Sequence, residues 1–249
     1  MQAPIFYAPP ELIKAGVVRL PDDEARHAIA VLRLKKSDQV IVIDGLGTAY
    51  RGMVARVSRP KAVEVTVHAE IRNFGEPSVI LTLAAGLSSG YKFDNVVARG
   101  TELGVKRFVP VFTSKSKVRL DDARRARARV ARLEKVALAA AKQCRRAYRP
   151  EISVPVNFAE YLRETDGESF NLIFHPTAKV RPLAVALDDA RPKRVSLLVG
   201  PESGFTDEEV EAAAAAGFVP VSLGGRVLRT ETAGPAVVTL IMHLLDELR

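Results

Sequence analysis

The chain has 249 residues, of which 47% are hydrophobic and 27% are charged, enough to bury a core in one large domain or two smaller ones. Its net charge of +8 favours a polyanionic partner, although ordinary solubility charge is an alternative. One cysteine and four scattered histidines exclude a disulfide or a multi-cysteine zinc site, and no apolar run reaches the roughly 20 residues of a membrane span, so we expect a cytoplasmic, metal-free protein.

The N-terminal part contains short alternating segments that predict antiparallel strands. Apolar and polar residues alternate strictly over 63–72, as in a strand with one buried face. Segments 40–43 and 50–57, joined by the Asp44–Gly47 turn, predict a hairpin, and 17–20 predicts a further strand. We therefore expect a small β-barrel over roughly residues 1–72.

One helix interrupts these strands and begins at Pro21 and Asp22. Its predicted buried face carries Ala25, Ile29 and Leu32. Arg26 and Arg33 fall on another side, where they are either phosphate contacts or plain solvated charges.

A turn-rich joint at 73–77 separates this part from a region in which apolar strands alternate with helices. The predicted strands are 79–83, 108–112, 172–174, 195–199 and 219–223. The predicted helices lie near 92–103, 122–148, 182–188, 206–216 and 231–248. This order predicts an α/β domain with a mostly parallel sheet covered on both faces.

The positive charge is concentrated in residues 115–149, which hold thirteen Lys and Arg against three acidic residues, a net +10. Apolar positions in this segment recur every three or four residues, so one stripe of the helix is expected to pack inward while the arginines face outward. The stripe consists of Val130, Leu133, Ala137, Ala141, Cys144 and Tyr148.

Two glycine-containing turns follow the last two predicted strands. The first, Val199–Glu209, enters a helix in which Thr206 and Glu209 form a predicted capping box. The second follows 219–223 and leads into the C-terminal helix. Ligands bind at the carboxyl ends of strands in open α/β sheets, so both turns suit a ligand site, although tight connections alone would also need glycine. Gly200–Gly204 lacks the Gly-x-Ser-x-Gly order of a serine hydrolase elbow, and Gly86–Lys92 lacks the spacing of a phosphate loop. No Gly-x-Gly-x-x-Gly sequence of a dinucleotide-binding loop follows a strand.

These residues resemble a known family. Leu198-Val-Gly-Pro-Glu-Ser-Gly-Phe-Thr-Asp-Glu-Glu209 and Leu223-Gly-Gly-Arg-Val-Leu-Arg-Thr-Glu-Thr-Ala233 resemble the RsmE family, the SPOUT-class 16S ribosomal RNA (uridine-N3)-methyltransferases. The resemblance extends to Glu24–Arg33, to Lys92 followed by Thr101–Gly104, and to Gln143 with Arg146. It differs from the family pattern at Leu133, Lys142 and Ser203 and over Ser88–Tyr91.

The resemblance implies a PUA-like RNA-binding β-barrel at 1–73 and a SPOUT methyltransferase domain at 74–249 with a deep trefoil knot. It further implies a homodimer that binds S-adenosyl-L-methionine and acts on the RNA of the small ribosomal subunit. Periodicity alone would assign an unknotted sheet, since threaded chains are rare. Two alternatives remain: an rRNA-binding assembly factor without catalysis, and a SPOUT methyltransferase with a different RNA target.

The resemblance also implies the site residues. For the cofactor they are Phe174, His175, Pro176, Leu198, Val199, Gly200, Pro201, Glu202, Gly204, Leu223, Gly224, Val227, Leu228, Arg229, Thr230, Thr232 and Ala233. For RNA we expect contacts through Arg26, Arg33, Lys92, Arg145 and Arg146, although these arginines could also be solvated. Arg229 is our expected catalytic residue, which would stabilise negative charge on the uracil; alternatively it is a salt-bridge partner of Glu231. Glu202 and Glu231 are either proton acceptors or helix caps, so the general base is left unassigned.

Overall fold

The computed structural model describes residues 2–58, 60–88, 91–116, 122–165, 167–176, 181–187 and 191–248. Parts of two predicted features, the 88–91 segment and the basic segment 115–149, lie outside these ranges at residues 89–90 and 117–121. The chain divides into two compact units: Met1–Glu76 with Leu138–Arg149, and Pro77–Ala137 with Pro150–Arg249. The longest helix, α3 (Ala123–Cys144), contributes residues to both units.

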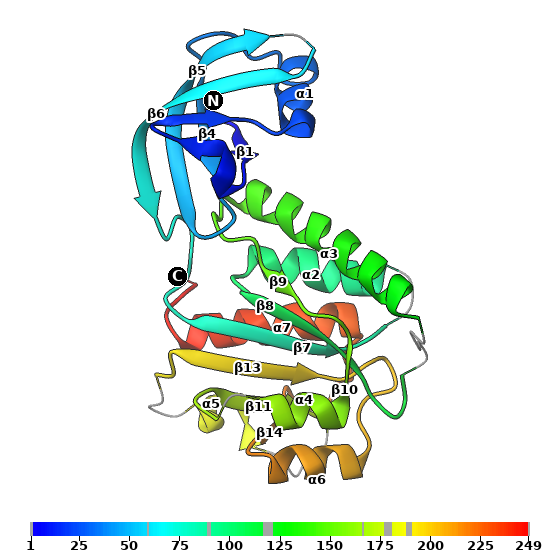
Figure 1. Ribbon diagram of the computed structural model, residues 1–249. Helices are drawn as coiled ribbons and strands as arrows, with labels where there is room; N and C mark the ends of the chain where they lie inside the picture. The colour runs from blue at the N-terminus through cyan, green and yellow to red at the C-terminus, as the bar shows by residue number, and fades with distance from the viewer. Residues whose placement is uncertain are drawn as a thin grey trace. The chain divides into compact units, whose positions relative to one another are not determined.

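The first unit is built on a curled, mixed sheet of six strands (Figure 1). They are β1 (Ile5–Tyr7), β2 (Ile13–Lys14), β3 (Val17–Arg19), β4 (Gln39–Ile43), β5 (Thr48–Ser58) and β6 (Ala62–Arg72), in the order β1-β4-β5-β6-β3-β2. Among the named strands of the described residues, β1 pairs in parallel with β4, and the other pairings are antiparallel. The predicted strands are confirmed, whereas β1, β2 and the 3-10 helix at Pro10–Leu12 are too short to show a period.

Helix α1 (Asp22–Ala30) covers the core of the first unit, and its Ala25 and Ala28 are fully buried. The predicted helix was too long, because the chain leaves the helix at Ala30. Leu32 is 41% exposed and Arg33 has a φ of 54°, so the buried stripe stops one turn earlier than its sequence spacing suggested.

The second unit contains an eight-stranded sheet in which every described pairing is parallel. Its strands are β7 (Ile80–Gly86), β8 (Arg107–Phe112), β9 (Glu151–Ile152), β10 (Val156–Asn157), β11 (Phe170–Phe174), β12 (Arg181–Pro182), β13 (Arg194–Val199) and β14 (Val219–Ser222). They run in the order β10-β8-β7-β13-β11-β14-β12, with β9 beside β8. The predicted parallel sheet is confirmed, and the last long strands, β13 and β14, lie on either side of β11.

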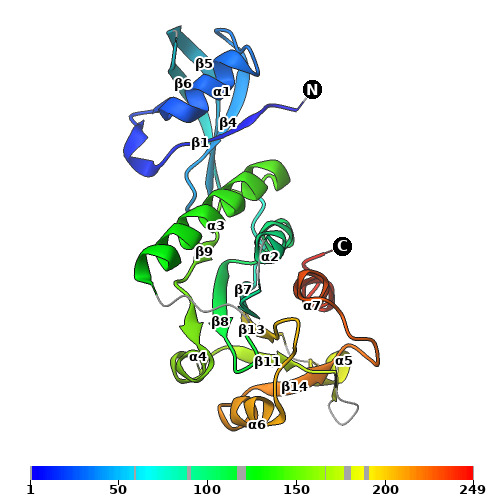
Figure 2. The ribbon, with the colours of Figure 1, turned by 90° about the vertical axis from the view of Figure 1, so that its right-hand side faces the viewer.

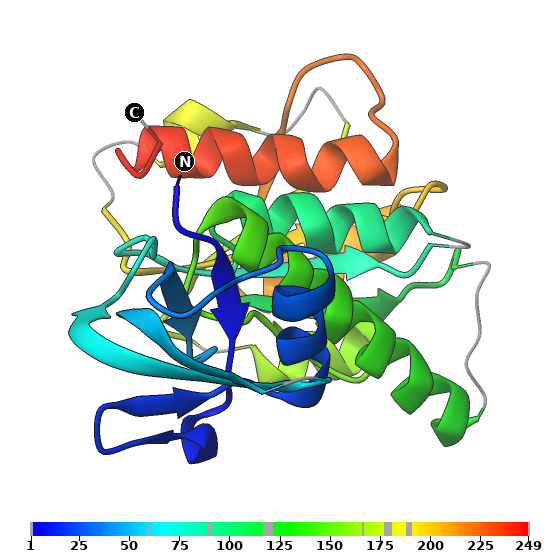
Figure 3. The ribbon, with the colours of Figure 1, turned by 90° about the horizontal axis from the view of Figure 1, so that it is seen from above.

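Helices cover both faces of this sheet (Figure 2). One face carries α2 (Lys92–Glu102), α3, α5 (Leu183–Ala186) and α7 (Thr230–Leu244), and the other carries α4 (Phe158–Glu164) and α6 (Asp207–Ala215). Figure 3 shows α2 and α7 side by side. The sequence pattern missed α4, which has only seven residues and so spans barely two turns.

Two predicted helices end earlier than expected. Helix α3 ends at Cys144 rather than 148, because Arg145 has a φ of 65°, which no right-handed helix accommodates. Helix α7 ends at Leu244 rather than 248, and Asp246 with a φ of 64° follows it. Leu133 and Ala137 of the predicted stripe on α3 are fully buried against the sheet of the second unit.

Candidate active site

A pocket lies in the second unit at the carboxyl ends of β11, β13 and β14. Its position is the one expected for a ligand in an open parallel sheet. Three segments line it, at 174–176, 199–205 and 223–228, together with Ala233 and Val237 of α7.

In the first glycine turn, the backbones at Gly200 and Gly204 lie very close together. A Cβ on Gly200 would lie 3.2 Å from Cα of Gly204, and Gly204 has a φ of 68°. Glycine is therefore required at Gly204 by conformation and is favoured at Gly200 by space. The predicted capping box is confirmed: the Thr206 side chain accepts from the Glu209 backbone N–H, and Glu209 accepts from the Thr206 N–H.

Ser203, which differs from the family pattern, fits this turn without strain. Its φ is not positive, and its hydroxyl donates to the carbonyl of Lys115 at 2.8 Å. Lys115 returns a hydrogen bond from Nζ to the carbonyl of Phe205 at 3.1 Å. The segment that follows β8 thus holds the turn from outside.

Two further contacts fix the pocket walls. A Cβ on Gly86, at the end of β7, would lie 2.3 Å from the backbone N of Pro201, so only glycine lets the two backbones approach. The Thr230 hydroxyl, at the start of α7, donates to the carbonyl of Gly200 at 3.4 Å. The second glycine turn is thereby attached to the first.

The structure brings most of the predicted cofactor residues together. Those that line the pocket are Phe174, His175, Pro176, Val199, Gly200, Pro201, Glu202, Gly204, Leu223, Gly224, Val227, Leu228 and Ala233. Those that do not line it are Leu198, Arg229, Thr230 and Thr232. The Leu198 side chain packs on the opposite face of the sheet, since neighbouring residues of a strand face opposite ways.

Three lining residues were not predicted: Phe205, Arg226 and Val237. Arg226 lies within the second motif, so its place in the loop was available from the sequence. Phe205 and Val237 read as ordinary core residues, and both are buried. Only the packing of the turn and of α7 shows that they also face the pocket.

A group of charged residues lies at the pocket rim. Lys92 Nζ is 2.7 Å from Oε1 of Glu202. The hydrogen bond to Glu202, reinforced by the charges of Glu202 and Glu231, raises the pKa of Lys92 above its ordinary value, although desolvation and the charge of Arg229 oppose this rise. The three predicted catalytic residues are thus all close enough to Lys92 to act on it electrostatically.

Arg229 and Glu231 differ in their surroundings. Arg229 is the exposed N-cap of α7, and its side chain makes no capping hydrogen bond. Oε2 of Glu231 is buried and has no hydrogen-bond partner among the described residues. A buried acceptor without a donor is rare in folded proteins, and active sites are among the places where it occurs.

The predicted RNA-contact residues differ in how far their side chains are exposed. Arg26 and Arg33 are exposed, whereas Arg145 is partly buried and donates to the side chain of Gln2 and the carbonyl of Ala3. The placement of Arg146 on an RNA-facing surface is wrong, because only 3% of its side chain is exposed.

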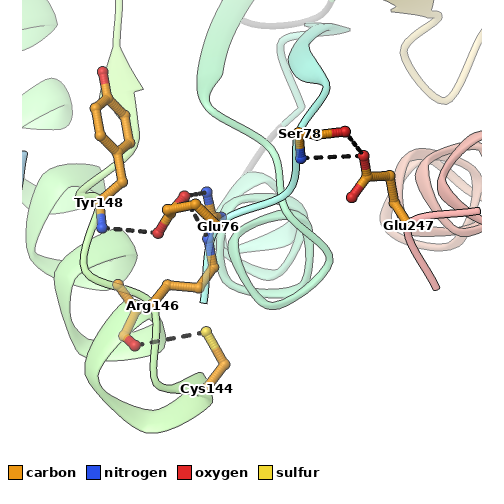
Figure 4. Close-up of polar contacts among 7 residues, drawn as sticks. Glu76, Ser78, Cys144, Arg146, Tyr148 and Glu247 are labelled. Carbon is orange, nitrogen blue, oxygen red and sulfur yellow. Dashed lines mark hydrogen bonds and ion pairs between the residues drawn. The ribbon is translucent and has the colours of Figure 1, made fainter. Parts of the chain in front are cut away.

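The Arg146 side chain forms an ion pair within the first unit (Figure 4). Its guanidinium pairs with Glu76 at 2.7 Å, and the other carboxylate oxygen of Glu76 accepts from the Tyr148 backbone N–H at 2.9 Å. The sequence showed an arginine in a basic segment, but its buried partner lies 70 residues away.

Across the described residues, no helix is long and apolar enough to cross a membrane, and no group of His, Cys, Asp and Glu forms a candidate metal site. The site is a largely apolar pocket with close backbone walls and a Lys92–Glu202 ion pair at its rim. Such an arrangement suits a small-molecule ligand.

The chain matches known proteins over nearly its whole length. Residues 75–242 match a family described as an RNA methyltransferase domain, and residues 20–67 match an RNA methyltransferase PUA domain. The ribosomal RNA small subunit methyltransferase E of Bacillus subtilis is 30% identical over 96% of this chain and 94% of its own, and that of Synechocystis is 30% identical over 97% and 78%. The crystal structure of ribosomal RNA small subunit methyltransferase E from Neisseria gonorrhoeae bound to S-adenosyl methionine has a TM-score of 0.87 at 30% identity and covers 98% of both chains.

Proposed function

Since this chain belongs to the ribosomal RNA small subunit methyltransferase E family, we propose that it methylates N3 of a uridine in 16S ribosomal RNA with S-adenosyl-L-methionine. The pocket at the carboxyl edge of the sheet carries this proposal, because thirteen residues of the three expected cofactor loops line it. The reaction removes a proton from N3 and leaves negative charge on the uracil. The charged residues at the rim could accept this proton and stabilise this charge.

The residues present fit S-adenosylmethionine. Its adenine would lie against the apolar walls, which include Val199, Leu223 and Leu228, while the glycine turns permit close contact with backbone groups. When bound, the cofactor supplies a methyl group on a sulfonium. The protein has to exclude water, orient the uracil and handle the proton.

Glu231 is the better candidate to accept the N3 proton. Its Oε2 is buried without a partner, whereas Glu202 is held by Lys92 at 2.7 Å. A free acceptor gains a hydrogen bond when N3–H approaches, and the proton then moves from nitrogen to the carboxylate oxygen. Glu202 would instead keep Lys92 in place.

Arg229 would stabilise the charge that this proton transfer leaves on the uracil. A guanidinium stays protonated and presents parallel donors to a carbonyl oxygen. The exposed position of Arg229 at the N-cap of α7 leaves its side chain free to meet the base.

The finer features implied by the family resemblance are also part of this proposal. They are the division at residue 73, the trefoil knot around the cofactor loops, the homodimer and RNA contacts through Arg26, Arg33, Lys92 and Arg145. The family match to an RNA methyltransferase PUA domain supports RNA binding by the first unit.

The decisive experiment maps methylated nucleotides in ribosomal RNA from a strain that lacks this protein. We expect one uridine of 16S rRNA to lose its N3 methyl group and to regain it when the wild-type chain is supplied, but not when Glu231→Gln is supplied. Loss at a different RNA would point to another target. An unchanged methylation pattern, with no binding of S-adenosylmethionine by calorimetry, would point to a non-catalytic assembly factor.

A further inference from the structure

An exposed aromatic side chain, Tyr91, precedes Lys92 in the chain and is not part of the hydrophobic core. Tyr91 immediately precedes α2, and it is 77% exposed. Among the large hydrophobic side chains of the described residues that are exposed, it is the one aromatic. Its side chain does not cap the helix. Neither burial in the core nor side-chain capping of the helix therefore explains an aromatic residue at this position.

One face of the Tyr91 ring is covered by an arginine of α3. The guanidinium carbon of Arg132 lies 5.4 Å from the ring centroid, within the range of a cation–π contact. Arg132 is itself fixed by an ion pair with Asp94, whose side chain is only 14% exposed. The ring is thus held from one side while most of its surface remains in solvent.

A second arginine of α3 holds the chain before Tyr91. Arg129 donates from Nη2 to the carbonyl of Ser88 at 2.9 Å. Burial, followed by the charge of Arg132, lowers the pKa of Arg129, whose side chain is partly buried. Two arginines of the basic helix are therefore engaged with Ser88 and Tyr91 rather than forming a free cationic surface.

The position of Tyr91 is tied to the pocket on both sides along the chain. Five residues earlier, Gly86 lies against Pro201 of the first glycine turn, and one residue later, Lys92 pairs with Glu202. Both partners line the pocket. Tyr91 is therefore the chain neighbour of a residue that pairs with a pocket-lining side chain.

We propose that Tyr91 is a stacking platform for an unpaired RNA base that flanks the methylated uridine, with Arg132 as a positioning residue behind the ring. The inference rests on the proposed function. Unpaired bases of single-stranded RNA stack on the faces of aromatic side chains, and a cation over the opposite face keeps the ring in place. A target uridine whose N3 has to be accessible must be unpaired, so its neighbours need support once the stack is opened.

The test uses the full chain and two assays. In the first, a single-stranded RNA with 2-aminopurine next to a uridine is titrated with protein, and stacking is read as fluorescence quenching. We expect wild type to quench, Tyr91→Ala to lose most of the quenching, and Tyr91→Phe to restore it. Val154→Ala, which alters another exposed apolar side chain of the same unit, is the matched control and should behave as wild type.

In the second assay, methylation of small ribosomal subunits is measured beside calorimetry with S-adenosylmethionine. Tyr91→Ala should raise KM for the subunits about ten-fold, as loss of one stacked base predicts, with cofactor affinity unchanged within about two-fold. Equal quenching by wild type and Tyr91→Ala, or no quenching by wild type, would overturn the stacking role. Quenching that depends on Tyr91 without any methylation by wild type would refute the proposed function instead.

Discussion

Among single residues of the site, Arg229 and Gly200 have opposite roles. Arg229 presents a charged group from the exposed start of α7, whereas Gly200 contributes the absence of a side chain where two backbones meet. The first is expected to act on the rate of reaction and the second on cofactor affinity. Substitutions at these positions therefore separate binding from catalysis.

Replacing Arg229 by lysine should lower turnover far more than cofactor affinity. Lysine keeps the charge but loses the planar pair of donors, so loss of one aimed donor should cost about 2–4 kcal/mol in the transition state. Single-turnover methylation of small subunits, beside a cofactor titration, measures both quantities. Near-normal turnover would show that only the charge matters, and a large loss of affinity would make Arg229 a cofactor residue.

Gly200→Trp should abolish binding of S-adenosylmethionine. Even a Cβ at this position would be 3.2 Å from Cα of Gly204, so an indole has to displace the turn or fill the pocket. Calorimetry on the full chain measures the loss. Gly167→Trp is the matched control, because a Cβ there meets nothing within 4 Å, and affinity equal to wild type in both variants would contradict the assignment of the pocket.

At the level of secondary-structure elements, buried polar contacts fix how segments join. The Arg146–Glu76 ion pair attaches the chain after α3 to the turn that follows β6. The two side chains are only 3% and 10% exposed. The Tyr161 hydroxyl of α4 lies 2.6 Å from Oγ of Ser196 on β13. Each contact can be broken without changing the site residues.

Arg146→Met should destabilise the fold by about 3–5 kcal/mol, because it leaves the carboxylate of Glu76 buried without its cation. The double variant with Glu76→Met should recover part of the loss, since both charges are then removed. Urea unfolding gives the free energies. The exposed Arg72–Glu70 pair provides the comparison, and Arg72→Met should cost no more than about 1 kcal/mol.

Tyr161→Phe should destabilise the fold by about 1–3 kcal/mol, because Ser196 loses its buried partner. Burial raises the pKa of the Tyr161 phenol above its ordinary value of 10.0. The phenol therefore stays neutral in the folded chain at pH values where it ionises in the unfolded chain, and stability falls as the pH rises above about 10. The variant should show a weaker alkaline loss in unfolding experiments, and an identical pH dependence would argue against a buried neutral phenol.

For the whole molecule, the family resemblance implies a homodimer, and the apolar residues on more than one side of the last predicted helix also favour one. The structure weakens that argument, since Val237, Val238 and Ile241 are fully buried within their own unit. Leu240 is 41% exposed and remains available to a partner. We still expect light scattering at micromolar concentration to give twice 27.1 kDa, and Leu240→Glu to reduce that mass, whereas a wild-type monomer would refute the prediction.

The sequence by itself determined most of the longer elements and the place of the candidate site. Strict alternation marked β6, and apolar runs marked the buried strands of the parallel sheet, because these patterns depend only on which side of the backbone meets the core. Ordered motifs around Gly200 and Gly224 indicated the cofactor loops, because a family resemblance needs only the order of residues.

Tertiary structure alone decided which side chains are free to act. Arg146 and Arg129 carry the same charge as any arginine of the basic segment, yet one pairs with Glu76 and the other supports Ser88. Glu231 and Glu202 read alike in the motif, but only Glu202 meets Lys92. Partners of this kind are distant in sequence, and burial depends on how elements pack, so no local pattern records whether a charge is already satisfied.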